Sequence, residues 1–245
     1  MKQIIRGKCY VVGDDIDTDQ IIPAQYLTYN PAIPEERKMF GRFAMIGLAE
    51  KFQGLPLGKI PFVKEGAEKS EYQILIAGRN FGCGSSREHA SICLQESGIE
   101  ACVAEFYSRI FFRNSVNGGY LIPFETEVRL VDQVKTGDEL EINVGRPHLK
   151  NLTTGKDFPL KPIGEVLPII EAGDIFKKLT SAVQRLNPLF SLADLPMWNE
   201  LTKGAKYSEE IKKESLLGGY KIAGIRTWIV GGRKITQTFE TRFDS

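Results

Sequence analysis

Residues 72–106 constrain the fold most, because two apolar runs enclose a glycine-rich loop and a helical pattern. "YQILIAG" (72–78) and "EACVAEF" (100–106) predict strands, and "SREHASICLQES" (86–97) predicts a helix between them. A strand, loop, helix and strand in this order form most simply a parallel, right-handed crossover. The sequence therefore predicts an α/β protein.

The rest of the chain predicts further elements of both kinds. They are a strand at "CYVV" (9–12), a helical stretch at 34–52, a helix at 107–119, a strand at 120–124, β-structure over 125–163 and an amphipathic helix near the end of 164–186. We expect one domain over residues 1–186 and a C-terminal extension over 187–245, with helix and β-hairpin character. The hairpin is indicated by two alternating runs around Gly231 and Gly232.

The charge balance excludes some partners. The 245 residues contain 32 Lys and Arg against 31 Asp and Glu, which argues against a broad surface for nucleic acid or anionic membrane. No apolar run is long enough for a membrane span, and "MKQIIRGKCYVVGDD" has no signal-peptide core. We expect a cytoplasmic protein.

The stretch "AGRNFGCGSSREHA", here called the serine loop (residues 77–90), fits several chemistries. Gly82 and Gly84 can take positive φ, so that successive N–H groups converge on an anion, and Arg87 can grip a carboxylate bidentately. A phosphate loop is disfavoured because the lysine of the Walker pattern is missing and Glu88 replaces the third glycine of the dinucleotide pattern.

The four cysteines, which are Cys9, Cys83, Cys93 and Cys102, form no C-x-x-C pair. Their spacing is unlike that of zinc or iron–sulfur ligands, so we expect reduced, mostly buried thiols and no metal site in this chain. For Cys83, within the serine loop, a redox role and a packing role both stay open.

The serines leave two interpretations open. A serine nucleophile is disfavoured because the chain has only His89 and His148 as bases, and His89 lies one turn along the same predicted helix. Ser85 can act as a base if its alkoxide is stabilised by backbone N–H groups and an arginine. Equally, Ser85 and Ser86 can simply cap the helix.

Two motifs together resemble a known family. "DDIDTDQIIPAQYLT" (14–28), here called the aspartate loop, and "NFGCGSSREHA" (80–90) resemble the small subunit of 3-isopropylmalate dehydratase, which corresponds to the swivel domain of aconitases. "YSRIFFRNSVNGG" (107–119) and the stretch 153–176 also match, so that the resemblance covers roughly residues 5 to 180.

The resemblance implies a swivelling β/β/α fold like aconitase domain 4. It implies a partner, the large subunit, in a heterodimer or heterotetramer. Three cysteines of the large subunit would hold a [4Fe–4S] cluster, and the resemblance implies no cofactor in this chain. The reaction would convert 2-isopropylmalate and 3-isopropylmalate, two hydroxy-dicarboxylates, through 2-isopropylmaleate in leucine biosynthesis. The iron would take the hydroxyl as a Lewis acid.

The resemblance also assigns residues. Ser85 matches the serine that removes the carbon-bound proton, Ser86 and Arg87 match carboxylate-binding neighbours, and Asp19 matches an aspartate near the active site. Thr28, in "YLTY", stands at or near a position where relatives with a tricarboxylate substrate have arginine, so the pocket suits an apolar isopropyl group. Asp14 and Asp15 are expected to be solvated turn residues.

Two alternatives remain at this point. One is the small subunit of a homoaconitase or a related hydro-lyase acting on a C4 diacid, and the other is a non-catalytic carboxylate-binding module. The sequence does not decide whether Arg113 and Asn114 face the active site or the partner.

Overall fold

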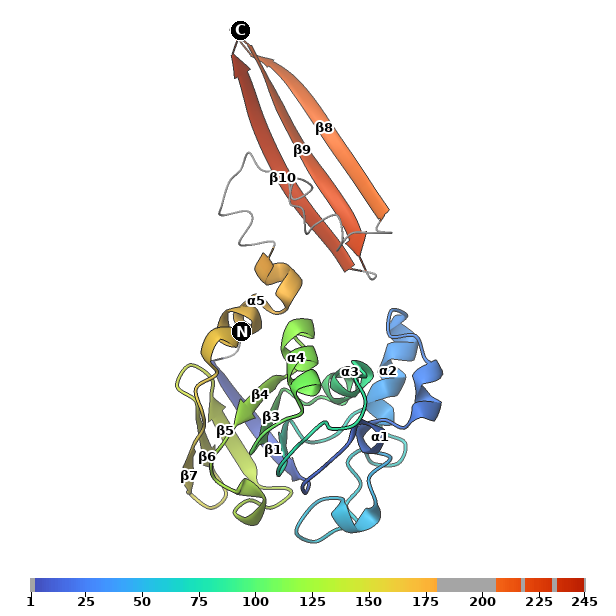
Figure 1. The fold of residues 1–245 in the computed structure, drawn as a ribbon, viewed down its shortest axis with the longest axis vertical. Helices are drawn as coiled ribbons and strands as arrows, with labels where there is room; N and C mark the ends of the chain where they lie inside the picture. Colours follow the sequence, from blue (N-terminus) through green and yellow to red (C-terminus); the bar gives the residue numbers. More distant parts are fainter. Residues whose placement is uncertain (1–2, 180–205, 217–218, 231–232, 245) are drawn as a thin grey trace. The chain divides into compact units, whose positions relative to one another are not determined.

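Strand β1 (Ile4–Val11) lies in the middle of a seven-stranded sheet with the order β4-β3-β2-β1-β5-β6-β7. On one side lie parallel strands: β2 (Ile74–Ile76), β3 (Ala101–Ala104) and β4 (Ile122–Glu125). On the other side lie antiparallel strands: β5 (Glu139–Asn143), β6 (His148–Asn151) and β7 (Asp157–Pro159) (Figure 1). The predicted α/β class and the parallel pairing of β2 with β3 are confirmed.

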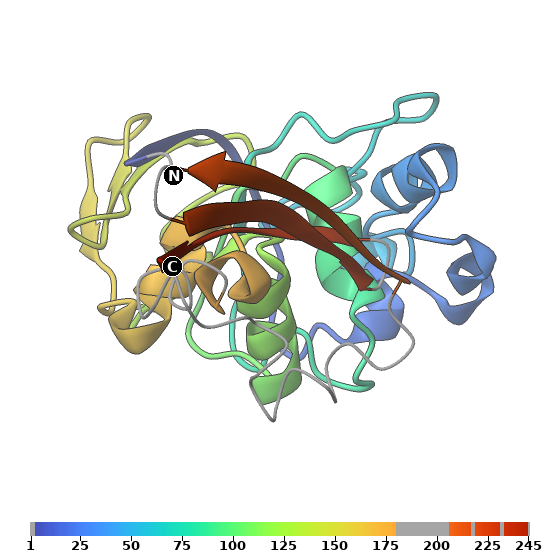
Figure 2. The same cartoon turned by 90° about the horizontal axis from the view of Figure 1, so that it is seen from above.

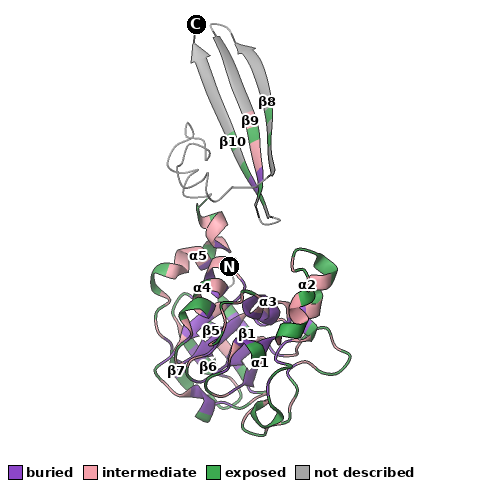
Figure 3. Ribbon diagram, turned by 45° about the vertical axis from the view of Figure 1, so that its right-hand side comes forward, coloured by how far each residue is buried: buried purple, intermediate pink, exposed green. Residues whose placement is uncertain are grey.

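The two faces of β1 bury different cores, because side chains alternate along a strand. Tyr10 and Val12 belong to a cluster that includes side chains from helices α2, α3 and α4. Cys9 and Val11 belong to a second cluster, which contains Leu140, Leu149 and Phe158 of β5, β6 and β7. Figure 3 shows α3 as mostly buried, whereas β1 and β5 alternate between buried and exposed positions. Helices therefore cover one face of the parallel strands, and the antiparallel strands contribute to the core on the other face.

The helices are short and follow the strand ends. They are α1 (Thr18–Ile21), η1 (Ala24–Thr28), α2 (Pro34–Arg42), η2 (Glu50–Phe52), α3 (His89–Glu96), α4 (Arg109–Gly118), η3 (Leu130–Asp132), η4 (Gly164–Val166) and α5 (Leu167–Ala172). Helix α4 ends at Gly119 with φ of 64°, as its Asn-Gly-Gly sequence predicts. No helix in the described parts of the chain has the length and apolar character needed to cross a bilayer.

This computed structural model describes residues 3–179, 206–216, 219–230 and 233–244. The chain divides into two compact units, Met1–Ile175 and Phe176–Ser245. The boundary expected between residues 186 and 187, and the end of the helix expected within 164–186, lie outside the described residues.

The second unit contains a three-stranded antiparallel sheet: β8 (Lys206–Leu216), β9 (Gly219–Val230) and β10 (Arg233–Asp244). Figures 1 and 2 show these strands side by side. The predicted hairpin is confirmed, because Val230 pairs with Arg233 across the turn. Strand β8 was not predicted, since its many charged residues hide the alternation of a strand.

Candidate functional site

The aspartate loop and the serine loop continue the parallel pairing of β1 and β2 beyond the ends of those strands. Three backbone hydrogen bonds join them: Asp15 N–H to Arg79 O at 2.8 Å, Gly82 N–H to Ile16 O at 2.8 Å and Thr18 N–H to Cys83 O at 2.9 Å. A parallel bridge also pairs Asp17 with Cys83. The two loops therefore meet at the carboxyl edge of the parallel strands, where open α/β sheets bind ligands.

The hydroxyl of Ser85 contacts the first residue of α1. Ser85 Oγ lies 3.0 Å from Thr18 Oγ1, and the backbone N–H of Ser85 donates to the same Thr18 oxygen at 3.1 Å. Either hydroxyl can be the donor in the contact between the two side chains. A hydroxyl that accepts from an amide can still donate its own proton, so Thr18 can donate to Ser85 Oγ when the Ser85 oxygen carries no proton.

The expected helix start and cap are wrong. Helix α3 begins at His89, its N-cap residue is Glu88, and no side chain caps it. The segment from Ser85 to Arg87 is a loop because its partners are in the aspartate loop, 67 or 68 positions away in sequence. The interpretation of Ser85 and Ser86 as simple helix caps is therefore wrong.

Both loop glycines adopt the left-handed conformation that was expected. Gly82 has φ of 75° and Gly84 has φ of 91°. A Cβ on Gly82 would lie 2.6 Å from Cδ2 of Phe111, and a Cβ on Gly84 would lie 3.3 Å from Thr18 Oγ1. Glycine is required at position 82 by both its φ and its packing.

The predicted carboxylate-binding residues lie next to Ser85. The guanidinium of Arg87 donates through Nη1 to Oδ1 of Asp19, which brings these two expected site residues together. Asn114 of α4 donates through Nδ2 to the carbonyl oxygen of Ser86 at 3.4 Å, so Asn114 faces the loop. Arg113, the preceding residue, is exposed.

Helix α1 is stabilised by hydrogen bonds between residues of its own first turn. Asp17 caps it, accepting from Gln20 N–H at 2.7 Å, while the Gln20 side chain accepts from Asp17 N–H at 2.8 Å. This reciprocal capping box stabilises the short helix that carries Thr18 and Asp19.

Thr28 lies apart from this group. It is the last residue of η1 and is exposed, whereas Tyr26, Leu27 and Tyr29 are partly buried against the core. Among the described hydrogen bonds and ion pairs, none joins Thr28 to Ser85. Its expected role in selecting the substrate stays a prediction.

Three of the four cysteines, Cys9, Cys93 and Cys102, are buried, and Cys83 is partly buried. Burial raises the pKa of Cys9 to about 12 and that of Cys102 to about 12, and it raises the pKa of Cys93 further. Burial is also the largest cause of the raised pKa of Cys83, and the charges of Asp17 and Asp15 add to it. Within the described residues, no three His, Cys, Asp or Glu side chains form a metal site, so they do not fit a [4Fe–4S] cluster.

His89 is the first residue of α3. Its ring packs 5.5 Å from the ring of Phe40, and burial lowers its pKa. The His89 ring therefore packs against a buried side chain of α2.

Sequence reasoning missed Thr18. The signal was available, because Thr18 is a hydroxyl residue between two aspartates in the loop that follows a predicted strand.

The mixed sheet and the two paired loops, which bring Ser85 against Thr18, define a domain of the aconitase C-terminal type. The family model described as "Aconitase C-terminal domain" matches residues 14–127. The 3-isopropylmalate dehydratase small subunit 1 of Arabidopsis thaliana is 50% identical over 177 residues, which are 71% of this chain and 68% of that protein. Small subunit 1 from Methanopyrus kandleri is 39% identical over 176 residues, which are 71% of this chain and 92% of that protein.

A solved structure of a related protein supports the same family assignment. The crystal structure of 3-isopropylmalate dehydratase from Methanocaldococcus jannaschii matches with a TM-score of 0.60 and 34% identity, over 75% of this chain and 97% of that chain. The chain described here belongs to the family of 3-isopropylmalate dehydratase small subunits.

Proposed function

We propose that this chain is the small subunit of a 3-isopropylmalate dehydratase and that Ser85 is its proton-transferring base. The reaction is the isomerisation of 2-isopropylmalate and 3-isopropylmalate through 2-isopropylmaleate, by loss and return of water. The observation that carries the proposal is the placement of Ser85 Oγ, 3.0 Å from Thr18 Oγ1 at the carboxyl edge of the sheet. The names of the relatives do not favour the homoaconitase and binding-module alternatives.

Ser85, as an alkoxide, takes the proton from the carbon next to a substrate carboxylate and becomes a neutral hydroxyl. The electrons of the C–H bond form the double bond of 2-isopropylmaleate. The substrate hydroxyl leaves with its bonding pair, which the Lewis acid of the partner subunit would accept. The Thr18 hydroxyl donates to Ser85 Oγ and so stabilises the alkoxide before the transfer.

Arg87 and Ser86 bind a substrate carboxylate in this proposal. Asp19 engages one nitrogen of the Arg87 guanidinium, which has further N–H donors for a carboxylate. The hydrogen bond from Asn114 to the Ser86 carbonyl fixes the part of the serine loop that carries Ser86 and Arg87. Asp19 therefore orients Arg87.

The Lewis acid belongs to a partner. Because the described residues do not fit a cluster, we assign the [4Fe–4S] group to a large subunit, as the family resemblance implies. The test is reconstitution of this chain with its cognate large subunit, with the absorbance of 2-isopropylmaleate as the signal. Dehydration of 3-isopropylmalate by the complex, and by neither subunit alone, is expected; a complex that forms without this activity would contradict the proposal.

Substrate selection is assigned to Thr28. No side chain among residues 26–29 carries a positive charge, so a third carboxylate has no ionic partner there. Thr28→Arg is expected to raise kcat/KM for a tricarboxylate such as homocitrate relative to 3-isopropylmalate, measured on the reconstituted enzyme. Thr28→Lys tests whether charge alone suffices, and an unchanged ratio in both variants refutes the role.

A further inference from the structure

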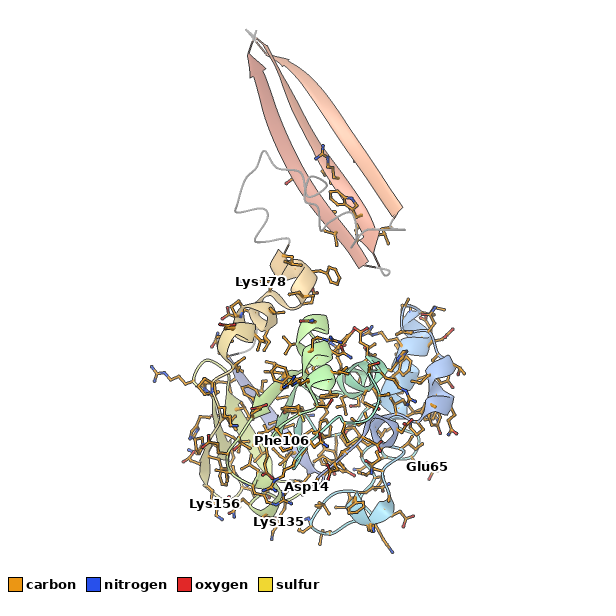
Figure 4. All side chains as sticks on the ribbon, in the orientation of Figure 1. Asp14, Glu65, Phe106, Lys135, Lys156 and Lys178 are labelled. Atoms are coloured by element: carbon orange, nitrogen blue, oxygen red, sulfur yellow. The ribbon has the colours of Figure 1, made fainter. Side chains whose placement is uncertain are left out.

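Within four positions after the end of each parallel strand lies a charged residue that belongs to one network of contacts. Asp14 follows β1, Arg79 follows β2, Glu105 follows β3 and Arg129 follows β4. We call them the charged clamp. Asp14 is labelled in Figure 4 at the edge of the sheet where β1 ends.

Arg129 connects three carboxylates in the charged clamp and its surroundings. Its Nη1 and Nη2 donate to the two oxygens of Asp14 at 2.9 and 3.1 Å, and Nη1 also donates to Glu105 at 2.7 Å. Its Nε lies 3.2 Å from Asp132. Arg79 Nε donates to the other oxygen of Glu105 at 3.0 Å, so that the four strand ends are linked in one network.

The geometry distinguishes this network from an ordinary surface ion pair. Isolated exposed pairs contribute little to stability, but bidentate pairs within a network contribute more. Glu105 is largely buried, with 14% of its side chain exposed. The hydrogen bonds from Arg129 are the largest cause of the lowered pKa of Asp14.

The charged clamp sits at the base of the two site loops. Asp14 Oδ1 accepts the backbone N–H of Arg79 at 2.8 Å, and the Asn80 side chain donates to Asp15 Oδ1 at 2.9 Å. Asp14 and Asp15 are exposed, as expected of a solvated turn, but both side chains also have hydrogen-bond partners in the serine loop.

The pairing at this base is irregular. Asp15 and Asn80 have positive φ, 54° and 56°, a conformation that Asp and Asn adopt more readily than other residues except glycine. Between the pairs Val11–Ile76 and Asp17–Cys83, the serine-loop side has one residue more than the aspartate-loop side. An unequal pairing of this kind needs additional contacts to keep a single register.

We propose that Arg129 is a positioning residue, which through the charged clamp holds the aspartate and serine loops in the register that places Thr18 against Ser85. It touches neither of these residues and acts through Asp14 and Glu105. This inference adds a positioning residue to the proposed function. Only the expected effect of Arg129 on turnover rests on that function.

The first experiment measures loop order in the isolated chain, without any activity. Hydrogen exchange is compared for Arg129→Gln and for Arg6→Gln, which removes an exposed surface ion pair with Glu139 near the start of β1. We expect exchange of the Thr18, Gly82 and Ser85 amides to rise about tenfold in Arg129→Gln only, while β2 and β3 stay protected. Loop exchange equal to that of Arg6→Gln overturns the proposal.

A variant that fails to fold is also informative. If Arg129→Gln loses protection in β2 and β3 as well, Arg129→Lys is measured, because lysine keeps the charge but cannot form the bidentate pair. Selective loss of protection in the loops is then expected. Loss throughout the sheet in both variants shows a general structural role and overturns the proposal.

The second experiment measures turnover with the large subunit. Arg129→Gln is expected to lower kcat about tenfold with a smaller change in KM, and Arg129→Lys is expected to recover part of the loss. An inactive wild-type complex contradicts the proposed function and leaves the exchange result to decide on Arg129. An active wild type with unchanged kcat in Arg129→Gln contradicts the positioning role alone.

Discussion

Substituting Gly82 by alanine tests how the serine loop is shaped. At φ of 75° an L-residue costs about 1–2 kcal/mol relative to glycine. The added Cβ would also lie 2.6 Å from Cδ2 of Phe111, a buried ring that packs edge-on against Phe81 at 5.1 Å. Overpacking of this kind costs about 1–3 kcal/mol more. Gly82→Ala is therefore expected to destabilise the first unit by about 2–5 kcal/mol.

The matched control is Gly155→Ala. Gly155 has the same φ of 75°, but a Cβ there would meet no atom within 4 Å. The difference between the two variants isolates the contact with Phe111. Equal destabilisation by both substitutions would refute the packing argument.

The assay must report on the unit Met1–Ile175. Both tryptophans, Trp198 and Trp228, belong to the other unit, so tryptophan fluorescence does not follow the right transition. Urea unfolding is instead followed by hydrogen-exchange protection of β2 and β3.

Two further predictions concern the partners of the loops. Thr18→Val is expected to lower kcat of the reconstituted enzyme about tenfold, because the donor to Ser85 is lost, whereas Thr18→Ser retains most activity; equal kcat in wild type and Thr18→Val would contradict the assignment. Asp14 has a lowered pKa, chiefly because Arg129 donates to it, so its contribution to stability is present above its unfolded pKa of about 3.9 and is lost as the pH falls through its folded value. Urea unfolding as a function of pH should show Asp14→Asn less stable than wild type at pH 7, with the difference disappearing at acid pH; a constant difference would rule out this linkage.

The sequence predicted the elements whose signals are local. The apolar runs that became β2 and β3 and the glycines at positions 82 and 84 followed from short-range patterns. Helix α4 also followed, since its stop at Gly119 needs no tertiary contact. The pairing of β2 with β3 could be inferred because a strand–helix–strand order strongly favours parallel strands.

The sequence did not predict features that depend on distant residues. The start of α3 was placed too early, because Ser85 is held by Thr18 in another loop rather than by the helix. The charged clamp was invisible for the same reason, since Asp14 and Arg129 are 115 positions apart. The expected role of Ser85 as a base came from the family resemblance. Its local sequence alone fitted a base and a helix cap equally well.

The most direct test of the account is the turnover of Ser85→Ala in complex with the cognate large subunit. Because Ser85 is assigned the proton transfer, kcat is expected to fall by about 10²–10⁴-fold. Ser108→Ala is the control, because Ser108 precedes α4 without a capping hydrogen bond from its side chain, and its kcat should stay near that of the wild type. Near-wild-type turnover in a Ser85→Ala complex that binds the large subunit normally would contradict the central claim.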